Sequence, residues 1–221
     1  MASAYRAPSL KDRQRRERQE LILRAAAGLL AERSYHDMSL DEIAARVGIS
    51  KGTIYLHFTS KEDLMIALFE RGIFAFQNML DEVTKGSALP SEKLATIIER
   101  VTRGMIADPG AQCMSAIAQN PEFVARLAEH HNEMRPICDD LRERIAQLIN
   151  EGKATGEFDP SLPTPLLLSL FTSLLSPHTA RQLAKVGGMT TEEIAEGLSR
   201  FFFKGIASLE HTLPTAASHG P

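Results

Sequence analysis

The chain has 221 residues, of which 43% are hydrophobic and 24% charged, so it can bury a core and is not a wholly disordered protein. Its formal net charge is -3, yet residues 1–61 carry an excess of four basic groups and the remaining residues an excess of seven acidic groups. The longest largely apolar run, over residues 166–176, is shorter than the roughly 18 residues that a membrane-spanning helix needs, so we expect no membrane partner.

The first predicted helix covers about residues 11–32, where Ile22, Ala25 and Leu29 recur at helical spacing. Four arginines lie in its N-terminal part: Arg13, Arg15, Arg16 and Arg18. They suit DNA phosphates or a neighbouring minor groove, because basic side chains release the counterions condensed on a phosphate backbone. The alternative is a solvated leader without a binding role. No apolar signal region follows this basic segment, and we expect the protein to remain in the cytoplasm.

Two short helices joined by a tight turn are predicted next. Ser39 can cap the first, because its hydroxyl can accept a hydrogen bond from the amide three residues on. Gly48 can adopt the left-handed conformation that ends this helix, and Ser50 can cap the following one. This layout in a basic segment is typical of a helix-turn-helix, here over residues 39–58, whose second helix lies in the DNA major groove.

The second helix of this motif is expected to turn one face to the core and another to DNA. Ile54 and Phe58 form an apolar stripe, and the opposite face carries Gly52, Thr53 and Leu56. Gly52 permits a close backbone approach, whereas Thr53 and Leu56 can touch base edges or a thymine methyl group. Four flanking residues suit contacts with phosphates: Lys51, Tyr55, His57 and Lys61.

The stretch from residue 22 to residue 64 resembles the DNA-binding domain of the TetR/AcrR family of bacterial transcriptional regulators. The most specific part reads VGISKGTIYLHF over residues 47–58, followed by SKEDL over residues 60–64. The resemblance implies that eight residues match positions through which the family touches DNA: Ser39, Ser50, Lys51, Gly52, Thr53, Tyr55, His57 and Lys61. The two serines would cap their helices in any protein, and Tyr55 has packing as its alternative role.

Helical periodicity continues through the rest of the chain. A fourth helix is expected from Ser60 to about Asp81, and no stretch alternates with a period of two, so the predicted fold class is all-α. Further candidate helices cover about residues 91–107, 110–119, 121–152, 163–184 and 190–210. We expect a three-helix helix-turn-helix domain at 1–62, a ligand-binding and dimerisation domain at 63–211, and a disordered tail at 212–221.

The resemblance implies that the last two helices, 163–184 and 190–210, pair with a second subunit as a four-helix bundle. The leucines of residues 166–175 cover more than one helical face, so one face can pack inward and another against a partner. The alternative is a helix buried within one subunit. A two-fold homodimer is also what a palindromic DNA operator demands.

The family's larger domain encloses a ligand cavity, for which this chain offers apolar, pliable side chains. The candidate lining residues are Phe74, Met79, Ile98, Thr102, Met105, Ile106, Cys113, Met114, Ile117, Met134, Leu141 and Phe171. A mostly apolar cavity favours a small apolar or amphipathic effector over a sugar or nucleotide, whose polar groups would lack partners. The alternative is that these residues only pack the helices together.

The expected protein is therefore a ligand-responsive, homodimeric repressor that releases its operator when the effector binds. No cofactor, metal site or catalytic site is expected: His131, Met134 and Cys138 do not make a closed metal site, and no nucleophile elbow or glycine-rich phosphate loop occurs. Two alternatives stay open. One is a redox-responsive regulator that uses Cys113 and Cys138, and the other is a helical enzyme or carrier with a degenerate DNA-binding module.

Overall fold

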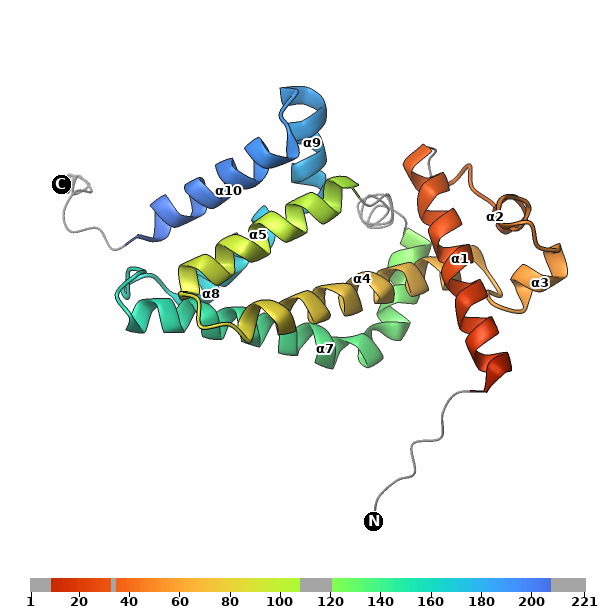
Figure 1. The fold of residues 1–221 in the computed structure, drawn as a ribbon, viewed down its shortest axis with the longest axis horizontal. Helices are drawn as coiled ribbons and strands as arrows, with labels where there is room; N and C mark the ends of the chain where they lie inside the picture. Colours follow the sequence, from red (N-terminus) through yellow and green to blue (C-terminus); the bar gives the residue numbers. More distant parts are fainter. Residues whose placement is uncertain (1–8, 33–34, 108–120, 208–221) are drawn as a thin grey trace, which may run out of the picture.

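The structure, a computed structural model, describes residues 9–32, 35–107 and 121–207 (Figure 1). In this part of the chain every regular element is a helix, which confirms the all-α fold. Helices α1 (Leu10–Glu32), α2 (Leu40–Val47) and α3 (Lys51–Tyr55) lie at one end of the molecule, and α4 (Lys61–Thr84) runs from them into the larger domain. The other helices are α5 (Pro90–Ala107), α7 (Pro121–Ala154), α8 (Thr164–Leu174), α9 (Pro177–Gly187) and α10 (Thr191–Ile206).

The short helices begin and end at the capping residues predicted from the sequence. The hydroxyl groups of Ser39, Ser50 and Ser60 accept from the amide three residues on, at 3.2, 3.1 and 3.1 Å. Gly48 ends α2 in the left-handed conformation, with φ 75° and ψ 32°, which costs a glycine little. These local contacts set the turn between α2 and α3.

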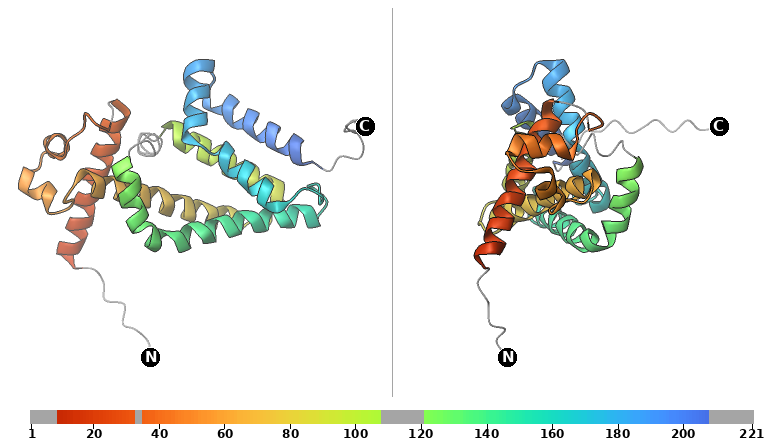
Figure 2. Two further views of the ribbon diagram at one scale, coloured as in Figure 1. Left: turned by 180° about the vertical axis from the view of Figure 1, so that it is seen from behind. Right: turned by 90° about the vertical axis from the view of Figure 1, so that its right-hand side faces the viewer.

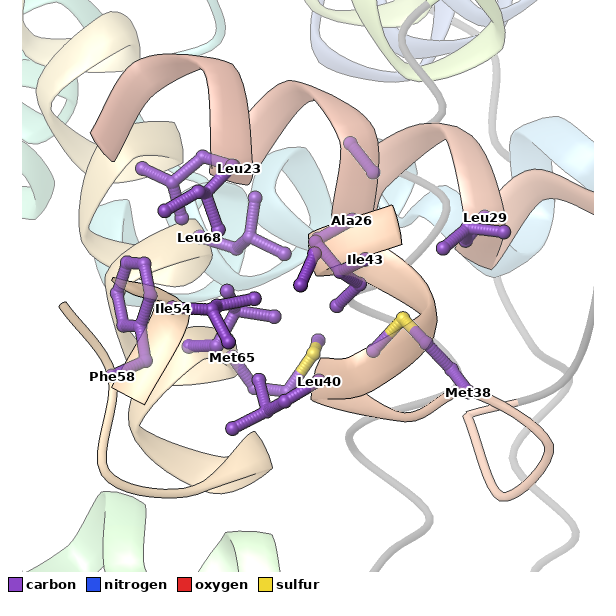
Figure 3. Close-up of a cluster of buried hydrophobic side chains, with 14 of the residues drawn as sticks. Leu23, Ala26, Leu29, Met38, Leu40, Ile43, Ile54, Phe58, Met65 and Leu68 are labelled. Carbon is purple, nitrogen blue, oxygen red and sulfur yellow. The ribbon is translucent and has the colours of Figure 1, made fainter. Parts of the chain in front are cut away.

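A hydrophobic core joins α1, α2 and α3 to the first two turns of α4. Figure 3 shows the side chains of α1 and α2 converging with Ile54, Phe58, Met65 and Leu68. Ile54 and Met65 are completely buried. Since this core extends to Leu68, α4 is a packed part of the helix-turn-helix unit.

A second core lies in the larger domain, where α5 packs against α4, α7, α9 and α10. Leu80 of α4 is completely buried in this core, so a single continuous helix contributes to both cores. Arg144 of α7 donates to Asp81 at 2.7 Å and holds the C-terminal part of α4 to α7. The domain limits at 1–62 and 63–211 stay a prediction, but α4 is the element that connects the two units.

The prediction of one helix over residues 163–184 was wrong. α8 ends at Leu174, Ser176 is extended with φ -77° and ψ 127°, and Pro177 begins α9. A proline disfavours helical conformation in the residue before it and lacks an N–H group, which is tolerated in a first helical turn. Pro136, by contrast, lies inside α7, and Figure 2 shows that this helix bends along its length. The predicted helix 110–119 and the tail 212–221 lie outside the described residues.

Candidate nucleic-acid interface and regulatory domain

The exposed face of α3 carries the residue types that the sequence placed toward DNA. Ile54 is 0% exposed and Phe58 is 4% exposed, whereas Tyr55 and Leu56 are 49% and 77% exposed. Gly52 is exposed as well, and the Thr53 hydroxyl lies 2.8 Å from the Ser50 hydroxyl. Because Ile54 and Phe58 are buried, the other side of α3 presents a glycine, a threonine and a tyrosine to a ligand.

Lys51 connects the start of α3 to α2. Its ammonium group donates to the Asp41 carboxylate at 2.5 Å, and this hydrogen bond raises the pKa of Lys51. The lysine side chain is 73% exposed, so the pair contributes little to stability. Part of the positive charge that was predicted to meet a phosphate is thus balanced within the motif.

His57 follows α3 and is partly buried. Burial lowers its pKa, and the positive charges of Arg15 and Arg18 lower it further. Its Nδ1 atom is buried without a hydrogen-bond partner among the described residues. These effects favour the neutral imidazole, which would meet a phosphate as a hydrogen-bond donor without a full charge.

Lys61, at the start of α4, is held by the loop that precedes α2. Its ammonium group donates to the carbonyl oxygens of Tyr35 and Met38 at 2.9 and 3.1 Å and lies 4.1 Å from the centroid of the Tyr35 ring. The Tyr35 hydroxyl donates to Glu62 at 2.7 Å. We name these contacts of Lys61, Tyr35, Met38 and Glu62 the loop clamp. Two of the three ammonium N–H groups thus donate within the fold, which limits what Lys61 can offer to the predicted phosphate contact.

Two contacts of this unit were not foreseen from the sequence. Tyr35 is 4% exposed and makes contacts of the loop clamp. The sequence feature that could have indicated its burial is the presence of an aromatic residue in a short loop. Arg46 of α2 donates to both oxygens of Glu32 at 2.9 and 2.6 Å, which ties the end of α2 to the end of α1. Nothing in the residue pattern indicated this pair.

The predicted ligand-lining residues divide into three groups. Ile98, Leu141 and Phe171 lie together in the core of the larger domain, with Met79 and Ile106 packed against it. Thr102 is 2% exposed and Met134 is 6% exposed, whereas Met105 is half-buried and Phe74 is 48% exposed. Three further predicted residues, Cys113, Met114 and Ile117, lie outside the described residues.

An open apolar groove runs between α8 and α10, with a volume of about 840 Å³. Its lining includes Leu166, Leu170 and Phe201, which are 48%, 50% and 74% exposed. Exposed apolar side chains that line one groove suit contact with an apolar partner surface. These are the helices for which a partner subunit was predicted.

The described residues offer little for redox or metal chemistry. Burial raises the pKa of the Cys138 thiol, which keeps it protonated and weakly nucleophilic, and its suggested partner Cys113 lies outside the described residues. In the described part of the chain, no group of three or more His, Cys, Asp and Glu side chains is placed to hold a metal ion. None of the helices described combines the length and apolarity needed to cross a membrane.

Two models of known protein families match most of the chain. Residues 22–68 match the bacterial regulatory proteins of the tetR family, and residues 87–206 match the tetracyclin repressor-like C-terminal domain. The chain belongs to the TetR family. Members of this family are DNA-binding transcriptional regulators and not enzymes, so the alternative of an enzyme is excluded.

Individual TetR-family proteins are similar over most of their length. The fatty acid metabolism regulator protein of Bacillus subtilis is 29% identical over 154 residues, which cover 70% of this chain and 77% of that protein. The regulator UidR of Escherichia coli is 27% identical over 173 residues, which cover 74% of this chain and 83% of UidR. A crystal structure of FadR from Bacillus subtilis in complex with stearoyl-CoA has a TM-score of 0.69 at 23% identity and covers 85% of this chain and 98% of that one.

The loop clamp makes Lys61 a stability residue as well as a candidate DNA contact. We expect Lys61→Gln to lower the free energy of unfolding by about 1–3 kcal/mol, because two charge-assisted hydrogen bonds are lost. Lys51→Gln, the matched control at an exposed ion pair, should change it by less than about 1 kcal/mol. Urea denaturation at one fixed protein concentration measures both. Equal small effects would show that the loop clamp does not stabilise the fold.

Proposed function

We propose that this TetR-family protein is a homodimeric repressor that binds a palindromic operator and releases it when a small amphipathic molecule occupies the larger domain. The observation that carries the proposal is the side of α3 opposite the buried Ile54, where Gly52, Tyr55 and the following Leu56 are exposed and Thr53 is half-buried. A helix entering the major groove needs small and hydrogen-bonding side chains on the side away from its core.

The α8–α10 groove supports the dimer. Two copies related by a two-fold axis would bury Leu166, Leu170 and Phe201 of one subunit against the same face of the other. The dimer would present two α3 helices to DNA, and half-sites about one helical turn apart, or multiples of this spacing, follow from such symmetry.

For the effector, we propose a long-chain acyl thioester. The similar Bacillus subtilis protein is a fatty acid metabolism regulator, and the similar FadR structure holds stearoyl-CoA. The larger domain of this chain has an interior of Ile98, Leu141 and Phe171, which suits an acyl chain. The polar head would remain near solvent, because burying its phosphates without partners is costly.

The proposed route from effector to DNA is α4. Its C-terminal part is tied to α7 through Asp81 and Arg144, and its N-terminal end is tied to the loop before α2 through Lys61. An effector that alters the packing of α7 against α4 would therefore move the loop clamp and with it the helix-turn-helix.

The α3 face is tested with the operator that the protein selects from fragmented genomic DNA. Thr53→Ala and Tyr55→Ala should each weaken operator binding by about 1–3 kcal/mol in fluorescence anisotropy, because both remove contacts to the duplex. Thr96→Ala on α5, whose hydroxyl donates to the Glu92 carbonyl of the same helix, is the control and should bind as the wild type does. Correctly folded Thr53 and Tyr55 variants with unchanged affinity would remove these residues from the interface.

The dimer is tested by charging the groove. Phe201→Glu should convert the dimer to a monomer in light scattering and weaken operator binding, because a buried carboxylate would face an apolar partner. Glu196→Lys also changes a charge on α10 but lies outside the groove, and it should leave the dimer intact. A wild-type protein that is monomeric at micromolar concentration would contradict the proposal.

The effector is tested by reciprocal titration. Stearoyl-CoA should bind the DNA-free protein and lower its operator affinity by about 5–150-fold, and saturating operator should weaken stearoyl-CoA binding by the same factor. Coenzyme A without an acyl chain is the control and should do neither. Tight binding of stearoyl-CoA with no change in operator affinity would refute the coupling between the two sites.

A further inference from the structure

The first nine residues of α1, Leu10–Arg18, form a helix that contributes nothing to a core. All nine are exposed, and the first buried residue of α1 is Ile22. The segment is capped by Ser9, whose hydroxyl donates to the Asp12 carboxylate at 2.6 Å. It carries five basic and two acidic residues. Packing, which supplies most helix stability in proteins, is absent from this segment.

The basic residues of this segment are not spread evenly around the helix. At about 100° per residue, Lys11, Arg15 and Arg18 lie within the same arc of about 80° as Ile22 and Ala26. Ile22 and Ala26 are both 0% exposed and face the core shared with α2 and α3. We name Lys11, Arg15 and Arg18 the basic row.

The same face of α1 is therefore apolar at Ile22 and Ala26, inside the helix-turn-helix unit, and basic in the first turns, which extend beyond that unit. In Figure 1 these first turns project beyond the unit on the side where α3 lies. Arg13 and Arg16, for which the sequence suggested the same phosphate-binding role, lie at least about 120° from the centre of the arc, so they are not part of the basic row.

A second observation places two residues of the basic row, Arg15 and Arg18, close to the end of α3. The positive charges of Arg15 and Arg18 act on the imidazole of His57, which directly follows that helix and its last turn. Such an interaction requires proximity, because exposed charges are screened beyond about 10 Å at ordinary salt concentrations. The row and the exposed face of α3 thus border the same side of the molecule.

We propose that the basic row binds the sugar-phosphate backbone of the same duplex that α3 enters, as a second DNA-contacting element outside the helix-turn-helix. Lys11 and Arg18 are about 10 Å apart along the helix axis, so the row can follow two or three phosphates of one strand. These contacts strengthen binding to any sequence and fix the orientation of α3, since phosphates carry no base information.

This inference rests on the proposed operator binding and is tested with two double variants. Arg15→Gln with Arg18→Gln removes two charges from the row, and Arg13→Gln with Arg16→Gln removes two charges from the other side of the same helical segment. Binding is measured by fluorescence anisotropy, over a series of KCl concentrations, to the selected operator and to a random-sequence duplex of the same length.

The row variant should bind both duplexes on the order of 10-fold more weakly. The negative slope of log affinity against log salt should become shallower, its magnitude decreasing by about two for each bound protomer. The control variant should retain the wild-type affinity within about 2-fold and keep its slope. Equal losses in both variants, or no loss in either, would overturn the proposal.

Two further readouts separate this inference from the proposed function. NMR titration should show a higher pKa for His57 in the row variant and not in the control, which tests the placement without DNA. If the wild-type protein binds the selected operator no more tightly than the random-sequence duplex, the proposed function is refuted instead. Binding to anionic phosphatidylglycerol vesicles is measured as well. If the row variant alone loses vesicle binding while its duplex affinity is unchanged, the row binds membranes and the inference is overturned.

Discussion

The burial of Ile54 determines what the helix-turn-helix can offer to DNA. A five-residue helix such as α3 has no stability of its own, because the first turn of any helix is costly to form. Its orientation therefore depends on one completely buried side chain, supported by the Ser50 cap before it and Phe58 after it. Because Ile54 points into the core, Thr53 and Tyr55 are left toward solvent.

Positive charge within this unit is divided between folding and binding. The charge of Lys51 is balanced by Asp41, and Lys61 directs two of its N–H groups to the loop clamp, so both lysines are partly engaged within the fold. Burial and the nearby arginines lower the pKa of His57 and so favour its neutral form. The charge most available for a polyanion is on the first turns of α1, where every side chain is exposed.

Local features were predictable from the sequence, and contacts between distant elements were not. The caps at Ser39 and Ser50 and the Ile54 stripe follow from residue types within a few positions of one another. The loop clamp joins Lys61 to residues more than twenty positions away, and no periodicity encodes such a pair. Pro177 itself indicates a helix break at the residue before it, but the apolar spacing on both sides favoured the prediction of one continuous helix.

The continuity of α4 has a mechanical consequence. Its 24 residues make a rod of about 36 Å, because each residue adds 1.5 Å along the axis. A tilt of about 5° around its C-terminal end would carry Lys61 sideways by about 3 Å, which is the length of a hydrogen bond. Under the proposed mechanism, a change in side-chain packing too small to alter the fold of the larger domain would therefore be sufficient to displace α3 from its DNA site.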